Sequence, residues 1–475
     1  MNMANVNIIM DGRSLTVPAG TSVLEAAREN GIRIPTLCFL KELDPRASCR
    51  LCVVEIEGAR TFQHACATKV REGMVVHTDT EAVRESRKLT LELLLSNHAV
   101  DCHHCLRIGS SHCDDLDPKF CEMCFFCDCV KDGFCELQAL AREYKVDMLP
   151  FAQKHNTHPI DDTTAIVRNP NKCIKCKRCV DVCGKVQTVH NLAASGRGCE
   201  VTIGPAFGRS MAESGCVGCG RCVEVCPTGA IYAMEHKDEL VYYAHRDGVK
   251  TAAMVDAAVI PELERVLKLQ PGSVTPEEIA GSLKKIGIDE VYDAADLETA
   301  AEAEAETLLT EQLAKGRGAI LTNSFAAKAF LEQDFPERKE SFVFYGSTLA
   351  QFGAALGGKA DKLFAFTPVG NDAAETEKTH PVDIAVNPRE LARIMIRTGS
   401  EPNPKRTAAL KPLSVPQPVG KYGRLLEKAA WSMERDAAPE RFTVGELKCV
   451  ICHNLGQARA VLESGEVWDV IRVIG

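Results

Sequence analysis

The sequence predicts an α+β protein of several domains, and three observations support this prediction. The chain has 475 residues, which is enough for about three or four domains that each bury a core. It starts with a hairpin-like pattern and a short helix, whereas apolar strands alternate with helices after residue 250. All but two of the 23 cysteines lie before residue 227, so the two halves differ in character.

The composition excludes several classes of partner. A net charge of −9 does not favour nucleic acid or an anionic membrane surface. The first residues contain no export signal, and no stretch has the roughly 18 apolar residues of a membrane span. We therefore expect a cytoplasmic protein, whose many cysteines bind metal in a reducing compartment and do not form disulfides.

Two cysteine motifs between residues 173 and 226 carry the strongest signal. CIKCKRCVDVC and CVGCGRCVEVCP both have the spacing C-x2-C-x2-C-x3-C. In this spacing three thiolates bind one [4Fe-4S] cluster and the fourth reaches a second cluster, although a pair of zinc sites is an alternative. One predicted ligand set is Cys173, Cys176, Cys179 and Cys226, and the other is Cys216, Cys219, Cys222 and Cys183.

The first 79 residues have the order of a β-grasp ferredoxin. VNIIM and SLTV flank a turn at Asp11-Gly12, and Ser22 with Glu25 opens a helix that stops at Gly31. Four thiolates saturate a [2Fe-2S] cluster, two on each iron, and zinc is the main alternative. The predicted ligands are Cys38, Cys49, Cys52 and Cys66.

This cysteine spacing resembles the N-terminal ferredoxin domain of the complex I large iron–sulfur subunit and of [FeFe]-hydrogenases. The next segments, LELLLSNH and CELQ, are also similar to those families. The resemblance implies a [4Fe-4S] cluster held by His98, Cys102, Cys105 and Cys135. The leucine-rich helix before His98, over residues 81–97, is expected to be buried on most sides.

An insert over residues 106–134 departs from that pattern. Its cysteines are Cys113, Cys121, Cys124, Cys127 and Cys129. They predict a supplementary [4Fe-4S] cluster, with Cys113 or Cys129 as the fourth ligand; structural zinc and unligated thiols are the alternatives. Cys129 is also a candidate to replace Cys105 at the neighbouring cluster, because its distance from Cys135 is typical of the family.

The second half contains no cysteine between residues 227 and 448. TAAMVDAAVI, EVYDAA and GAILTNS read as strands, and PEEIAGSLKKIG and ETAAEAEAETLLTEQLAKG read as helices. Their order resembles the catalytic domain of [FeFe]-hydrogenases. Where that family has cluster-binding cysteines, this chain has Ser324-Phe325, Gly346-Ser347 and Val369-Gly370. The resemblance therefore implies a hydrogenase-like domain without the hydrogen-activating cluster.

Shorter motifs in the second half do not predict nucleotide or haem binding. Gly353-x4-Gly358-Lys359 lacks the Ser or Thr of a phosphate loop, since Ala360 follows, and it reads as a helix. The sequence Cys449-Val-Ile-Cys452-His453 matches a haem motif, but it falls where a strand enters a helix; an additional metal site stays open there. No G-x-G-x-x-G follows a strand, so nicotinamide and flavin are expected on other subunits.

Four domains are predicted: residues 1–79, the [2Fe-2S] domain; residues 80–145, the domain of the His98 cluster with its cysteine-rich insert; residues 146–235, the two-[4Fe-4S] domain; and residues 236–475, the hydrogenase-like domain. The whole chain resembles the hydrogenase-like subunit of Stn-type electron-bifurcating transhydrogenases. That resemblance implies an iron–sulfur electron-transfer subunit whose partners are an FMN-containing NADH-oxidising subunit, an NADP-binding flavoprotein and ferredoxin. The alternative is the relay subunit of an NAD(P)-linked formate dehydrogenase or of a bifurcating hydrogenase.

Overall fold

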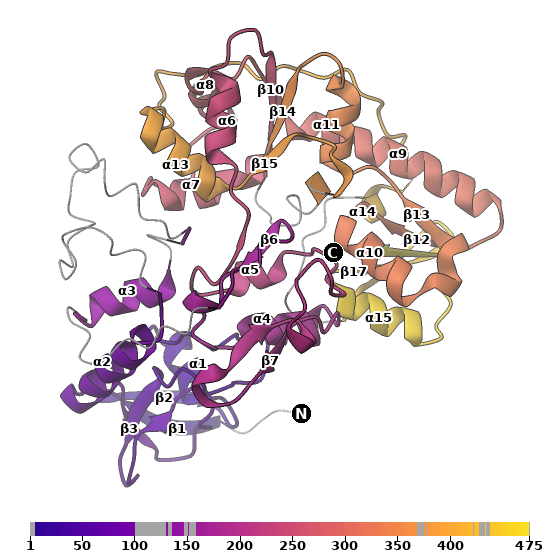
Figure 1. The fold of residues 1–475 in the computed structure, drawn as a ribbon. Coiled ribbons are helices and arrows are strands. Elements are labelled where there is room, and N and C mark those ends of the chain that lie inside the picture. Colours follow the sequence, from indigo (N-terminus) through magenta and orange to yellow (C-terminus); the bar gives the residue numbers. More distant parts are fainter. Residues whose placement is uncertain are drawn as a thin grey trace.

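The computed structural model describes residues 5–99, 130–131, 135–146, 151, 158–367, 375–376, 378–420, 422–426, 433 and 438–474. Figure 1 shows the N-terminal half in the lower part of the view and two α/β lobes of the C-terminal half above and beside it. Among the described helices, none combines the length and the apolar character that crossing a bilayer requires. The described residues form both helices and sheets, which agrees with the α+β class predicted from the sequence.

The N-terminal module begins with the predicted hairpin. Strands β1 (Asn5–Met10) and β2 (Arg13–Pro18) pair antiparallel across the turn at Asp11 and Gly12. Helix α1 (Val23–Glu29) follows, and its first turn is closed by the predicted capping box of Ser22 and Glu25. The mixed sheet has the order β2-β1-β5-β3-β4 and is completed by β3 (Val53–Ile56), β4 (Gln63–His64) and β5 (Val75–His77).

Helix α2 (Glu81–Leu95) lies against this module by one stripe only. Its buried residues are Val83, Arg87, Leu91 and Leu95, which recur every four residues. Leu89 and Leu93 are 49% and 48% exposed, so the expected burial on most sides is wrong. Arg87 fixes the helix, because its guanidinium donates to the carbonyls of Val53 and Thr78 at 2.8 Å each.

The central domain repeats one small unit twice. Each unit combines a strand, a cysteine loop and a short helix: β6 (Ile166–Arg168) with α4 (Arg178–Asp181), and β9 (Ile231–Ala233) with α5 (Arg221–Val225). Strands β6 and β9 pair antiparallel, and a second hairpin joins β7 (Ala193–Ser195) to β8 (Thr202–Gly204).

The two units end differently. After α4 the chain continues as a π-helical turn, η5 (Val182–Val186), which contains Cys183. After α5 the backbone of Cys226 is extended and Pro227 follows. Proline cannot continue a helix, whereas Gly184 after Cys183 permits the extra turn.

The first C-terminal lobe is a parallel sheet of order β11-β10-β14-β15. Its strands are β10 (Thr251–Val255), β11 (Glu290–Asp293), β14 (Lys362–Phe366) and β15 (Ile384–Val386). One face carries α6 (Lys237–Ala244), α7 (Ile260–Val266), α8 (Pro276–Ile286) and α13 (Pro388–Thr398). The predicted strand over residues 251–260 is too long, because Asp256 caps a helical turn and Pro261 lies in the first turn of α7.

The second lobe is a five-stranded sheet of order β13-β12-β18-β17-β16. Its strands are β12 (Ala319–Thr322), β13 (Phe342–Phe344), β16 (Glu440–Val444), β17 (Leu447–Cys452) and β18 (Val470–Val473). Helices α10 (Phe325–Asp334) and α15 (Leu455–Glu463) cover one face, and α14 (Gly423–Leu426) packs on the other.

One long helix, α9 (Ala294–Ala314), connects the two lobes (Figure 1). Its N-terminal part packs with α11 (Thr348–Leu356) on the first sheet, through Ala294 and Leu297. Its C-terminal part, including Leu309, packs on the second sheet. The segment predicted as one series of alternating strands and helices therefore forms two separate sheets that are joined by one helix.

Candidate metal centres

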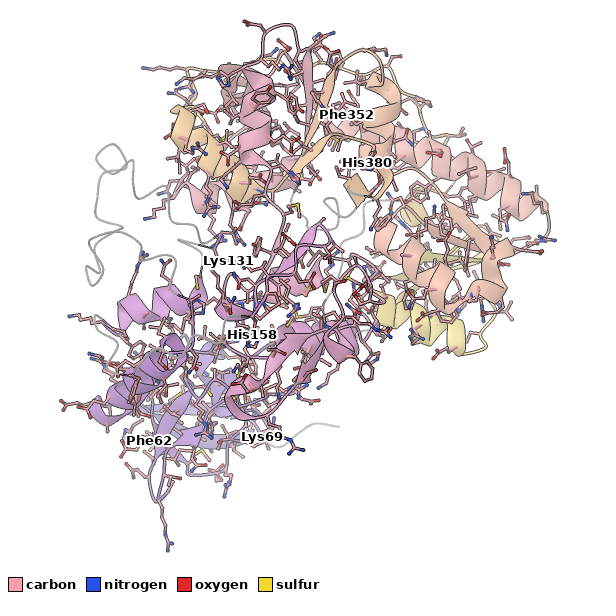
Figure 2. All side chains as sticks on the ribbon, in the orientation of Figure 1. Phe62, Lys69, Lys131, His158, Phe352 and His380 are labelled. Atoms are coloured by element: carbon pink, nitrogen blue, oxygen red, sulfur yellow. The ribbon has the colours of Figure 1, made fainter. Side chains whose placement is uncertain are left out.

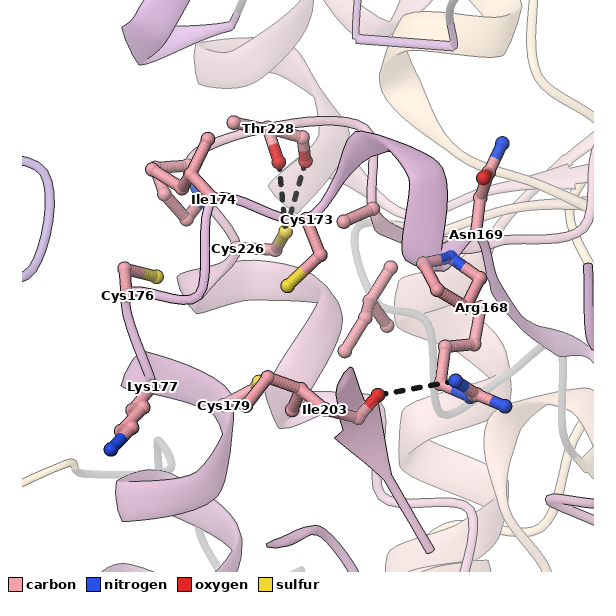
Figure 3. Close-up of a pocket in the computed structure, with 14 residues that line it drawn as sticks. Arg168, Asn169, Cys173, Ile174, Cys176, Lys177, Cys179, Ile203, Cys226 and Thr228 are labelled. Atoms are coloured by element: carbon pink, nitrogen blue, oxygen red, sulfur yellow. Dashed lines mark hydrogen bonds between the residues drawn. The ribbon is translucent and has the colours of Figure 1, made fainter. Parts of the chain in front are cut away.

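Four cysteines of the central domain line one cavity (Figure 3), here called the first cavity. They are Cys173, Cys176, Cys179 and Cys226. The first three come from the loop before α4 and from α4 itself, while Cys226 comes from the end of α5. The fold thus brings together three thiols of one motif and the last thiol of the other.

The remaining four cysteines of the two motifs line a second cavity. They are Cys183, Cys216, Cys219 and Cys222, and Val189, Leu192 and Met211 complete the wall. In each cavity, three cysteines come from one motif and the fourth comes from the other. This grouping is the one that the spacing predicts for two [4Fe-4S] clusters.

The donor set and its surroundings fit iron–sulfur clusters. Four thiols line each cavity, which is the number of ligands that a [4Fe-4S] cluster takes. Backbone N–H groups point at the sulfurs: Lys175 donates to Cys173 at 3.4 Å and Asn191 to Cys183 at 3.2 Å. Such bonds stabilise thiolates, which are the ligand form.

Burial makes these thiols poor acids on their own. It raises the pKa of Cys173 to about 11 and the pKa values of Cys176 and Cys216 to about 12. Burial also raises the pKa of Cys219, while the nearby Gln187 side chain acts in the opposite direction. A bound cationic metal would supply the missing positive charge, so these cavities suit thiolates only with metal present.

The predicted [2Fe-2S] ligands lie in two pairs at the edge of the first module. The sulfurs of Cys52 and Cys66 are 3.3 Å apart, and the N–H of Cys49 donates to the sulfur of Cys38 at 3.5 Å. All four cysteines are buried. Two close pairs fit a cluster in which each iron takes two thiolates.

The third predicted [4Fe-4S] site is described only in part. His98 is buried just beyond the end of α2, and Cys135 caps α3 (Glu136–Glu143), where its sulfur accepts from the N–H of Gln138 at 3.4 Å. The other predicted cysteines of this site and of the insert lie outside the described residues. They are Cys102, Cys105, Cys113, Cys121, Cys124, Cys127 and Cys129.

One hydrophobic cluster joins three of the predicted sites. It contains Cys38 and Cys49 of the first module, Cys135 at α3 and Cys176 of the first cavity. Leucines fill the space between them, among them Leu37 and Leu51, which are fully buried. The three sites are therefore separated by packed side chains and not by solvent.

Several polar residues that the sequence did not single out hold this junction together. Arg178 is buried next to Cys179, donates to both oxygens of Glu136 at 2.7 and 3.1 Å, and favours the thiolate of Cys176 by its charge. Lys131 donates to the carbonyl of Cys226 at 2.8 Å, and Figure 2 shows it between the two halves of the molecule. Arg178 and Arg221 occupy the same position in the two cysteine motifs, each directly before a cysteine. This repetition is the sequence signal that could have identified Arg178.

The hydroxyls at the hydrogenase-like positions have structural partners. Ser324 caps α10 by accepting from the N–H of Ala327 at 3.3 Å, and Ser347 caps α11 while bonding to Glu375. Gly346 donates its N–H to Glu304 at 3.1 Å. Val369 and Gly370 lie outside the described residues.

The two C-terminal cysteines do not form a joint site. Cys449 and Cys452 are three residues apart on β17, so their side chains point to opposite faces of the sheet and enter two different hydrophobic clusters. His453 pairs with Glu440 at 3.0 Å. The near phosphate loop at Gly353 is also excluded, since Gly353 lies inside α11.

Comparison with known proteins agrees with the arrangement of these sites. Residues 3–81 match the 2Fe-2S iron-sulfur cluster binding domain, and residues 213–232 match the 4Fe-4S binding domain. The NADP-reducing hydrogenase subunit HndD of Solidesulfovibrio fructosivorans is 31% identical, over 99% of this chain and 87% of its own length. This chain belongs to the HndD family.

Other relatives of this HndD-family chain share only part of it. The mitochondrial NADH-ubiquinone oxidoreductase 78 kDa subunit of Candida albicans is 29% identical over 44% of this chain, which corresponds to 26% of that protein. Among solved structures, an NAD+-reducing [NiFe]-hydrogenase in the H2-reduced state is 28% identical, with a TM-score of 0.39 over 48% of this chain and 88% of that one. The similarity to HndD over the whole chain and the two matched iron–sulfur domains identify an iron–sulfur subunit of an oxidoreductase, as predicted.

Proposed function

We propose that this HndD-family chain is the iron–sulfur electron-transfer subunit of a cytoplasmic electron-bifurcating transhydrogenase. Its partners would be a flavin-containing NADH-oxidising subunit, an NADP-binding flavoprotein and ferredoxin. Iron–sulfur clusters supply one-electron chemistry when they are bound. The chain itself would hold them at set positions, exclude water and tune their potentials.

The observation that carries this proposal is the hydrophobic cluster that connects the predicted sites. Cys38, Cys49, Cys135 and Cys176 belong to it. A chain that bound clusters for stability alone would have no need to place three sites around one dry core. Packed, low-dielectric surroundings also keep small solutes away from reduced metal.

A second candidate is the relay subunit of a hydrogenase complex, because HndD is named as a subunit of an NADP-reducing hydrogenase. An NAD(P)-linked formate dehydrogenase is the further alternative. The absence of cysteine between residues 227 and 448 weighs against hydrogen chemistry on this chain itself. Ser324 and Ser347 serve there as helix caps, and hydroxyls are weak ligands for iron compared with thiolates.

The test is anaerobic reduction of the purified, cluster-loaded chain. NADH alone should leave the iron–sulfur absorbance unchanged, whereas dithionite should bleach it. Adding a flavoprotein NADH subunit should make NADH effective, since a flavin divides a hydride into single electrons. Prompt bleaching by NADH without flavoprotein would place a nicotinamide site in this chain and contradict the proposal.

A further inference from the structure

The two cysteine motifs of the central domain are nearly the same sequence with one consistent difference. CIKCKRCVDVC and CVGCGRCVEVC correspond residue by residue, but Lys175 and Lys177 stand where the second motif has Gly218 and Gly220. All four residues have left-handed backbones, with φ of 59° and 65° at the lysines and 72° and 71° at the glycines. The backbone turn is thus shared, and only the side chains differ.

The left-handed turn is required by the cysteine loop. It directs the N–H of Lys175 to the sulfur of Cys173 at 3.4 Å, and the backbone of Gly218 makes the matching bond to Cys216. Residues with a Cβ are strained in this conformation, whereas glycine is not. Lysine is therefore the less favourable residue for folding at both positions of the first motif, which points to a role for its charge.

The charge around the two cavities differs accordingly. Lys177 lines the first cavity, its ammonium pointing outward in Figure 3, and the backbone of Lys175 contacts Cys173, so both lysines lie in the cysteine loop. Arg168 also lines this cavity, but Asp161 pairs with it at 3.5 Å. At the second cavity Arg221 is neutralised by Glu224 at 2.7 Å. With these arginines paired to carboxylates, the charge difference between the two motifs comes from Lys175 and Lys177, which the second motif replaces with glycines.

Acidic side chains add to this difference at the second cavity. Glu224 lies near Cys219 and Asp161 lies near Cys216, each also paired with an arginine, Arg221 and Arg168 respectively. Negative charge near a metal site opposes the arrival of an electron there. Lys175 and Lys177 at the first cavity act in the opposite direction to such acidic groups.

We propose that Lys175 and Lys177 raise the reduction potential of the cluster at the first cavity above that at the second cavity. The inference rests on the proposed function, because it needs a [4Fe-4S] cluster at each cavity. Reduction adds one electron to a cluster, and nearby positive charge stabilises the added negative charge. Electrons would then collect at the first cavity, where Cys176 joins the core shared with Cys38, Cys49 and Cys135.

The experiment uses the full-length, iron-loaded chain and the double variant Lys175→Gly/Lys177→Gly. Glycine suits the left-handed turn, so the variant should fold and bind iron as the wild type does. In a dithionite titration followed by electron paramagnetic resonance, one [4Fe-4S] midpoint should move to lower potential while the others stay. The charge-conserving control Lys175→Arg/Lys177→Arg should leave every midpoint unchanged.

A reciprocal variant identifies the second cluster. Glu224→Gln removes an acidic group near Cys219 and should move a different midpoint to higher potential. Unmoved midpoints in the glycine variant at full iron content would overturn the inference and leave the proposed function standing. A wild-type chain that fails to take up iron at the two cavities would overturn both.

Discussion

At the scale of single residues, Glu390 shows how one buried carboxyl sets a pH dependence. It lies in the first turn of α13, is fully buried, and accepts a hydrogen bond from the backbone N–H of His236. Burial, and then the nearby charge of Glu235, raise its pKa from 4.5 to about 8. The folded state thus keeps a proton that the unfolded chain loses, so this contribution to stability is complete below pH 4.5 and is lost as the pH rises through about 8.

The variant Glu390→Gln should remove this dependence, because an amide keeps the acceptor for His236 and has no charge to bury. We expect it to be more stable than the wild type at pH 8.5, by about 4 kcal/mol, and similar to it at pH 5. Anaerobic urea unfolding across this pH range is the measurement. Glu239→Gln, on a half-exposed carboxyl, is the control, and parallel pH profiles for Glu390→Gln and the wild type would contradict the prediction.

At the scale of elements, helix α15 contacts the π-helical turn that carries Cys183 and forms hydrogen bonds with the residues that follow it. The N–H of Leu455 donates to the Gln187 side chain at 3.1 Å, and Arg459 donates to Thr188 at 3.0 Å. A Cβ on Gly456 would lie 2.3 Å from the carbonyl oxygen of Val186. Only glycine therefore lets this helix approach the second cavity so closely.

The substitution Gly456→Ala should push α15 away from the turn. We expect the free energy of unfolding to fall by about 1–3 kcal/mol, as for other overpacked contacts. We also expect a change in the electron paramagnetic resonance signal of the reduced [4Fe-4S] cluster at the second cavity. Ala460→Ser, on the exposed side of the same helix, is the matched control. If Gly456→Ala has the stability and spectrum of the control, α15 does not support that site.

At the scale of the whole molecule, the predicted ligand sets define a metal content. One [2Fe-2S] and three [4Fe-4S] clusters correspond to about 14 iron atoms per chain. A further cluster in the insert would raise this to roughly 18 with negligible zinc, whereas one zinc beside about 14 iron atoms would favour a structural metal there. Iron and zinc analysis of the reconstituted chain checks this, and iron well below 14 at full loading would contradict the assignment.

The hydrogenase-like half supports a second prediction at this scale. Since residues 227–448 contain no cysteine, the chain should produce no hydrogen from reduced viologen, even after exposure to the maturation system of [FeFe]-hydrogenases. An authentic [FeFe]-hydrogenase treated in the same way is the positive control. Hydrogen evolution by the purified chain would show that an anchor for the active-site metal had been missed.

The sequence by itself determined the local features of this protein. Cysteine spacing predicted which thiols share a cavity, the hairpin and capping box marked the first module, and the alternation of apolar runs predicted the α/β half. These signals lie within a few dozen residues, where spacing and periodicity constrain the chain directly. No local pattern indicates that α9 connects two sheets, because its small alanine side chains can pack against either of them.

Only the tertiary structure decided how the parts meet. The exposed ridge of Leu89 and Leu93, the core shared by Cys38, Cys135 and Cys176, and the burial of Glu390 were not predicted. Leu455 and Gln187 bond across 268 positions of sequence. Contacts of this kind depend on which surfaces remain after each element has packed, and that is settled by the three-dimensional shape of distant segments and not by the pattern within any one of them.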